Sequence, residues 1–175
     1  QVSIFLGIFM AIAISRFIPH PPNFTSLIAL SFYVPAILGL SYIPAVILSF
    51  AITDIVIGYH TGTFFTWGSV FLIGMIAQSF SKTLISRLSG ALIGALIFFL
   101  VTNFGVWASG MYEYTVSGFV DCYFLAIPFF AYSLISTLMF SIIIEILLNK
   151  MNIFFSVFFF FLFCFLFLVF FFFFL

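Results

Sequence analysis

Six polar, charged or indole side chains stand out in this otherwise apolar chain, because each falls in or beside a long hydrophobic run. An ionised group inside such a run costs about 2.5–3.5 kcal/mol on membrane-insertion scales, so it normally faces a bundle interior or a wet cavity. A buried amide likewise needs hydrogen-bond partners. These side chains could bind a polar ligand through charge, amide and ring contacts. The candidate binding residues are therefore Arg16, His20, Asp54, His60, Asn103 and Trp107.

Asp54 is the candidate that most needs an explanation. It lies six residues before His60, which places it about 9 Å below the end of a helix that terminates there. Thr53 and His60 share one stripe of that helix, and Asp54 lies about 100° around from Thr53. One interpretation gives Asp54 a binding role, alone or with Arg16. The other is that Asp54 pairs with Arg16 or caps a neighbouring helix and so holds the bundle together.

Asn103 and Trp107 stand four residues apart, so on a helix their side chains lie on one face. An amide beside an indole suits a planar or heteroaromatic ligand. Trp67 and Trp107 could equally belong to the aromatic belt that lies at membrane interfaces. Asn103 has no such alternative, because an amide within an apolar span must be satisfied by hydrogen bonds.

The sequence gives little support for a metal site or for catalysis. His20, His60, Asp54 and Asp121 are of types that bind divalent metals, but no two have a metal-site spacing such as i, i+4 on one helix. There is no glycine-flanked serine elbow with a histidine partner and no His-Glu-x-x-His helix. We therefore expect no metal, no cofactor and no enzymatic activity. Zero net charge also gives no basic field for nucleic acid.

Composition indicates which elements must position these side chains. Hydrophobic residues make up 66% of the chain and charged residues 5%, with a mean hydropathy of +1.47. A soluble domain has about 25% charged residues, so this is a membrane protein. A bilayer core needs about 20 apolar residues per helix. The sequence predicts an all-α polytopic membrane protein with a bundle of six transmembrane helices, at residues 2–18, 25–39, 42–60, 67–82, 86–108 and 122–148.

The few cations predict the orientation. Lys82 and Arg87 flank the connection between the fourth and fifth spans, and Lys150 follows the sixth. The positive-inside rule assigns both segments to the cytoplasm, so the N-terminus and the end of the sixth span are also cytoplasmic. The candidate residues then gather at the outer ends of the helices. Arg16 is the one cation at the outer side, either as a binding partner or as a side chain that snorkels to headgroups.

The chain divides into a six-helix transmembrane domain at residues 1–150 and a low-complexity tail at 151–175. Ile153–Leu175 holds 14 phenylalanines in 23 residues and specifies no packing. The tail is either a seventh, lipid-facing helix or the translation of a T-rich stretch after a shifted or lost stop codon. We assign it no function and expect deletion of residues 153–175 to leave folding and activity intact.

Small residues form smooth stripes on two predicted helices. Gly7, Ala11 and Ser15 recur every four residues in the first span, and Gly90 and Gly94 do so in the fifth. Such stripes let another helix approach closely. They usually serve packing within the chain, but the stripe on the first span is also a candidate docking face for a partner membrane subunit.

Four strings carry a resemblance: Pro19-His20-Pro21-Pro22-Asn23-Phe24-Thr25, Gly58-Tyr59-His60-Thr61-Gly62-Thr63, Val101 to Trp107, and Cys122-Tyr123 through Pro128-Phe129-Phe130. Over residues 5 to 148 the chain resembles a family of uncharacterised bacterial transport proteins, which is similar to the substrate-binding S components of energy-coupling-factor transporters. The resemblance implies a bacterial inner membrane protein with a vitamin-sized outer pocket. It also implies a transmembrane coupling subunit that carries two ATPases and docks on the first helix, where Gly7-x-x-x-Ala11 replaces the usual Ala-x-x-x-Ala.

Two functions of different classes remain. The first is a subunit for uptake of a vitamin-like small molecule, which binds its ligand outside through Asp54, His60, Asn103 and Trp107, with Arg16 and His20. The second is a structural or assembly protein whose polar outer face contacts another protein. The lipid bilayer surrounds the chain in both cases.

Overall fold

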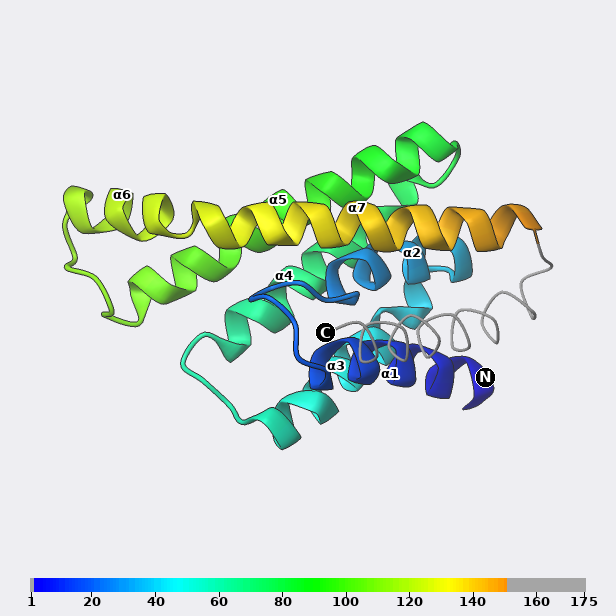
Figure 1. Cartoon of the computed structure of the whole chain (residues 1–175), viewed down its shortest axis with the longest axis horizontal. Helices are drawn as coiled ribbons and strands as arrows, with labels where there is room; N and C mark the ends of the chain where they lie inside the picture. Colours follow the sequence, from blue (N-terminus) through cyan, green and yellow to red (C-terminus); the bar gives the residue numbers. More distant parts are fainter. Residues whose placement is uncertain (1, 151–175) are drawn as a thin grey trace.

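The computed structural model describes residues 2–150. Within that range all regular secondary structure is helical, with no β-strand. Figure 1 shows the helices as an elongated bundle, with α6 and the start of α7 at one end and the N-terminus at the other. The expectations for residues 151–175 lie outside the described range. The elements are α1 Val2–Phe17, α2 Leu27–Leu38, the 3₁₀ helix η1 Leu40–Tyr42, α3 Ile43–Ile57, α4 Thr63–Ile76, the 3₁₀ helix η2 Ala77–Phe80, α5 Leu84–Ala108, α6 Val116–Leu125 and α7 Ile127–Lys150.

Four of these helical segments are long and apolar enough to cross a membrane, which is fewer than the six spans predicted. They are Leu40–Ile57, Thr63–Phe80, Leu84–Ala108 and Ile127–Asn149. The first two predicted spans are shorter helices, because α1 ends before the proline-rich turn and α2 ends at Gly39, whose φ is +105°. At 1.5 Å per residue, the 12 residues of α2 extend only about 18 Å.

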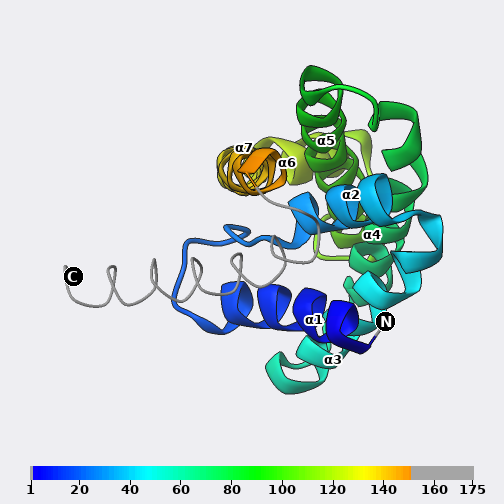
Figure 2. The same ribbon diagram turned by 90° about the vertical axis from the view of Figure 1, so that its right-hand side faces the viewer.

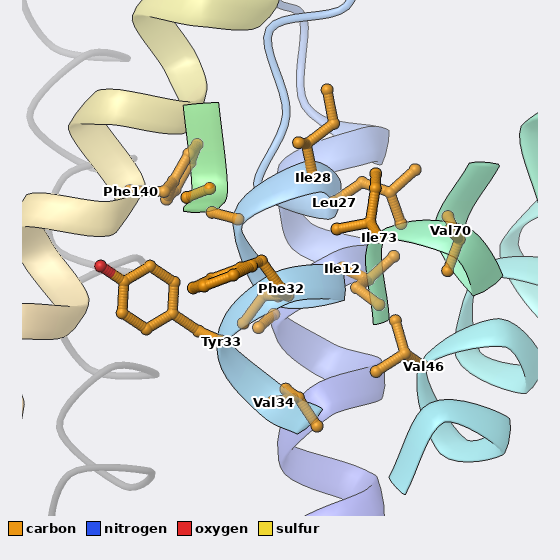
Figure 3. Close-up of a cluster of buried hydrophobic side chains, with 14 of the residues drawn as sticks. Ile12, Leu27, Ile28, Phe32, Tyr33, Val34, Val46, Val70, Ile73 and Phe140 are labelled. Atoms are coloured by element: carbon orange, nitrogen blue, oxygen red, sulfur yellow. The ribbon is translucent and has the colours of Figure 1, made fainter. Parts of the chain in front are cut away.

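The short α2 is the central helix of the bundle. Leu27 through Pro35 are all buried, so α2 is enclosed on every side, as expected for a helix that is hydrophobic all round. Figure 2 shows α2 between α1 and α7, with α5 and α4 beside it. In Figure 3, Phe32 of α2 lies between Phe140 of α7 and Ile73 of α4. The buried core is therefore built around α2.

Glycines on α5 let it approach this centre closely. A Cβ added at Gly90 would lie 2.5 Å from the Phe32 ring, and one at Gly94 would lie 3.0 Å from Ile73. Ala91 and Ala95 are fully buried on the same part of α5. The small-residue stripe of the fifth predicted span thus serves packing within the chain.

The sixth predicted span, 122–148, is two helices in the structure. Thr115 caps α6 by accepting a hydrogen bond from the Gly118 backbone N–H. Pro128 has no N–H to donate back to Phe124, so α6 ends and α7 begins afresh at Ile127. The prediction of one continuous helix was wrong at this point. The length of the apolar run alone gave no sign of the break that Pro128 causes.

Candidate functional site

A cavity of about 440 Å³ lies at the end of the bundle where α5 ends and α7 begins. The loops that follow α1 and α3 and the loop after α5 also contribute to its wall. Its lining is mostly apolar with a few polar groups, which is the usual make-up of a small-molecule site. The lining residues are Pro22, Asn23, His60, Thr66, Phe98, Phe99, Thr102, Asn103, Val106, Tyr112, Cys122, Leu125, Ala126, Phe129, Phe130 and Ser133.

Asn103 lines this cavity from α5, as the sequence predicted for a binding residue. Its Nδ2 donates to the Phe99 carbonyl, one turn earlier, over 2.7 Å. No side chain or backbone N–H in residues 2–150 donates to its Oδ1, which can accept a hydrogen bond from a ligand. The amide therefore offers a ligand one of the polar contacts on this wall.

His60 is the second predicted residue on the cavity wall. Its backbone N–H donates to Thr63 Oγ1 over 3.0 Å, and its Nδ1 accepts from the Gly62 N–H over 3.1 Å. An accepting Nδ1 in a neutral ring places the proton on Nε2. His60 can thus act as a donor through Nε2 from an exposed loop between α3 and α4.

Two aromatic rings of the wall are stacked. Phe99 of α5 and Phe130 of α7 have ring centroids 4.5 Å apart with planes 29° from parallel. Tyr123 of α6 meets Phe99 edge-on at 5.6 Å and donates from its hydroxyl to the Leu100 carbonyl. This packing makes one side of the cavity aromatic.

Sequence reasoning did not single out Ser133 or Thr66 as binding residues. Ser133 Oγ donates to the Phe129 carbonyl and Thr66 Oγ1 to the Thr63 carbonyl, both on their own helices. A hydroxyl that can hydrogen-bond to a carbonyl of its own helix does not stand out in an apolar span as a binding group. Only the packing of α4 and α7 shows that these two residues face the cavity.

Asp54 does not line the cavity and is instead held inside the chain. Its Oδ1 lies 2.7 Å from Arg16 Nη2, and its Oδ2 accepts a 2.7 Å hydrogen bond from Trp67 Nε1. Arg16 also donates to Thr53 Oγ1, and its guanidinium lies 4.4 Å over the ring of Phe50. The Asp54 side chain is only 3% exposed.

This cluster joins three helices, α1 through Arg16, α3 through Asp54 and α4 through Trp67. Of the two interpretations open from the sequence, the structure shows the pairing of Asp54 with Arg16. Both carboxylate oxygens already accept a hydrogen bond or ion pair and the side chain is buried, so Asp54 is not open to a ligand in this arrangement. Trp67, which the sequence placed only in an interfacial belt, is part of the polar core.

Residues 1–151 match the model of a family described as a family of unknown function, DUF6580. The chain belongs to this family. No curated protein and no solved structure matches the chain. The family assignment therefore brings no activity with it, and the function has to be argued from the site.

Trp107 of this family member lies beside the cavity wall rather than on it. Its Nε1 donates to the Glu113 carbonyl over 3.1 Å, and its ring packs edge-on against Tyr114 and Phe119. The expected joint face of Asn103 and Trp107 is therefore not formed at the cavity. Trp107 instead fastens the loop between α5 and α6, which carries Tyr112 onto the cavity.

His20 is also outside the cavity. It is exposed in the turn after α1, where its Nδ1 lies 2.7 Å from the Pro21 carbonyl oxygen. The next residues of that turn, Pro22 and Asn23, do line the cavity. The proline-rich string thus contributes to the site through Pro22 and Asn23, not through the imidazole of His20.

The stripe of Gly7, Ala11 and Ser15 on α1 is not an open surface in this family member. Gly7 and Ala11 are buried. Ser15 Oγ lies 2.8 Å from Ser26 Oγ, and Ser26 Oγ donates to the Ala11 carbonyl over 3.1 Å. The stripe packs against the start of α2, so it cannot at the same time receive another subunit.

A second buried ionic cluster lies at the other end of the bundle. Glu145 of α7 accepts two hydrogen bonds of 2.6 Å from Arg87 of α5, and one of 2.9 Å from the Tyr33 hydroxyl of α2. Arg87 Nη1 also donates to the Ser81 carbonyl. Sequence reasoning used Arg87 only to orient the chain and did not pair it with Glu145.

In the described part of the chain, no three histidine, cysteine or carboxylate side chains come together as metal ligands. His20 and His60 lie on separate exposed loops, and Asp54 is held by Arg16. What the geometry offers chemically is a binding cavity with an amide, an imidazole and stacked rings.

Proposed function

We propose that this family member is a membrane-embedded protein for small-molecule uptake, which binds a vitamin-like ligand without changing it chemically. The observation that carries the proposal is the 440 Å³ cavity with Asn103 on its wall, whose side-chain Oδ1 accepts no hydrogen bond from residues 2–150. Cavities of about 300–1,000 Å³ suit ligands of this size. An uptake protein needs such a site, whereas a protein that only packs in a membrane does not.

The lining suggests the ligand's chemistry. The stacked rings of Phe99 and Phe130 suit a planar or heteroaromatic group. Asn103 can accept a hydrogen bond through Oδ1, and His60 can donate one through Nε2. Arg16 and Asp54 are paired with each other, so neither of them offers a ligand an unpaired charge. A neutral aromatic micronutrient therefore fits the wall better than an anion.

The proposed location is the inner membrane of a bacterium, which all six predicted spans would cross. The two short helices, α1 and α2, would do so because neighbours shelter them, and α2 is buried over most of its length. The cavity would face outward, since Lys82 and Arg87 lie at the opposite end of the bundle. The N-terminus and the end of α7 would then be cytoplasmic.

The energy for uphill uptake would come from a partner, as in the S components of energy-coupling-factor transporters. The sequence has no phosphate-binding loop of its own. A coupling subunit with ATPases would dock on the cytoplasmic side. Because Gly7, Ala11 and Ser15 pack within the chain, the docking face must be another surface, such as the exposed Val2, Leu6 and Met10 of α1.

The test is purification of the full chain in mild detergent, with mass spectrometry of released small molecules and co-eluting proteins. We expect a bound micronutrient in the wild type and its loss in Asn103→Leu, with expression unchanged. Ser31→Ala is the matched control, because it alters a buried polar residue outside the cavity and should retain the ligand. An empty wild-type protein in another membrane complex that Asn103→Leu disrupts would instead support the assembly function.

A further inference from the structure

One face of α7 carries a polar side chain every four residues, from the cavity to the second ionic cluster. The residues are Ser133, Thr137, Ser141 and Glu145. Positions four apart on a helix lie above one another, so the four form a single stripe about 18 Å long. Ser133 lines the cavity and Glu145 binds Arg87, so the stripe joins the two ends of the bundle.

The two middle hydroxyls are buried, and neither has a well-formed hydrogen bond to the described part of the chain. Thr137 is 0% exposed and Ser141 1%; no atom in residues 2–150 accepts from or donates to Thr137 Oγ1, and Ser141 Oγ has only the neighbouring Tyr33 hydroxyl beside it. Ser133 and many other hydroxyls here donate to a carbonyl of their own helix. Buried polar groups in native proteins nearly always have a partner, and where the protein supplies none the usual partner is ordered water.

The surroundings of the stripe are polar at its far end. Tyr33 extends from α2 toward α7 (Figure 3), and its hydroxyl lies beside Ser141 while it donates to Glu145. The Tyr33 hydroxyl can still accept one hydrogen bond. A water molecule at Ser141 would therefore find polar partners on both α7 and α2.

We propose that ordered water molecules bind Thr137 and Ser141 and connect the cavity at Ser133 with the Tyr33, Glu145 and Arg87 cluster. These residues form a hydrated seam through the buried core. The seam goes beyond the uptake function and does not depend on the ligand's identity. Its basis is the two buried hydroxyls, each of which would otherwise carry the desolvation cost of an unmade hydrogen bond.

X-ray hydroxyl-radical footprinting of the purified full chain tests the seam, because radicals formed from bound water modify the side chains next to it. We expect oxidation of Tyr33, although that residue is only 1% exposed. In the double variant Thr137→Val with Ser141→Ala, the Tyr33 oxidation should fall to background. Ser31→Ala is the control: Ser31 is buried but donates to the Leu27 carbonyl, so Tyr33 oxidation should persist.

Thermal unfolding gives an independent readout on Thr137→Val alone. A water-bound hydroxyl is part of a network, so its removal should lower the unfolding midpoint. Removal of a hydroxyl with no partner at all should raise the midpoint, because it relieves an unmade hydrogen bond. A raised midpoint, or a wild-type Tyr33 that is not oxidised, would overturn the proposal.

Discussion

Arg87 and Glu145 form a two-point ion pair across the bundle, with Nε to Oε1 and Nη2 to Oε2 both at 2.6 Å. The pair ties the start of α5 to the end of α7, and the Glu145 side chain is only 4% exposed. Removal of one member of a buried pair leaves the other charge without compensation. The pair is therefore one of the two ionic contacts that hold the helices in register.

Glu145→Gln should destabilise the protein by about 3–5 kcal/mol, because it leaves the Arg87 guanidinium buried without a counter-charge. Unfolding in mixed micelles with increasing sodium dodecyl sulfate would measure the change. The double variant Arg87→Met with Glu145→Leu should lose less stability than Glu145→Gln. If the double variant lost as much stability as Arg87→Met and Glu145→Leu together lose as single variants, the charges would not be coupled.

Asp54→Asn should destabilise the protein by about 1.5–3 kcal/mol, the range for hydrogen bonds to charged groups. The reason is that Asp54 holds Arg16 and Trp67 on two other helices. Trp67→Phe should have a smaller effect, since it removes one hydrogen bond and leaves the ion pair. The same micelle unfolding assay measures both variants. If Asp54→Asn lost ligand binding without a change in stability, the result would show that Asp54 is a binding residue.

Gly90→Ala should destabilise the protein by about 1–3 kcal/mol through overpacking. The new Cβ would lie 2.5 Å from the Phe32 ring and 2.6 Å from Phe80 Cβ. Gly68→Ala is the matched control on α4, because no atom lies within 4 Å of a Cβ built there. The control should gain about 0.5–1 kcal/mol from helix propensity. Thermal unfolding midpoints of the two variants should move in opposite directions.

Trp107→Phe should speed ligand release while it leaves the fold intact. The phenyl ring keeps the contact with Phe119 but loses the hydrogen bond to the Glu113 carbonyl, which fastens the loop that bears Tyr112. One such bond is worth about 1 kcal/mol, so affinity should fall roughly fivefold. Dissociation rates of the ligand identified by mass spectrometry provide the measurement.

Ser109→Ala is the control for the loop. Its hydroxyl donates only to the Val106 carbonyl one turn away and does not fasten the loop. Ligand release should be the same as in the wild type. Equal release rates in Trp107→Phe and Ser109→Ala would mean that the loop between α5 and α6 does not retain the ligand.

The sequence by itself determined the helical, membrane-like class. Asp54 and Asn103 could be recognised as residues that need partners, because a polar group in an apolar run is costly wherever the run packs. Helical spacing also placed Gly90 and Gly94 on one face of the fifth predicted span. These inferences depend only on local chemistry and on the 3.6-residue period.

Only the tertiary structure decided which partner each polar group has. Asp54 meets Arg16, 38 positions earlier in the sequence, and Glu145 meets Arg87 and Tyr33, so neither contact follows from periodicity. Packing around the end of α5 placed Asn103 on the cavity wall, whereas the Trp107 side chain lies against the loop that follows the helix. Periodicity defines a face of a helix, but the neighbour that covers this face is set by long-range packing.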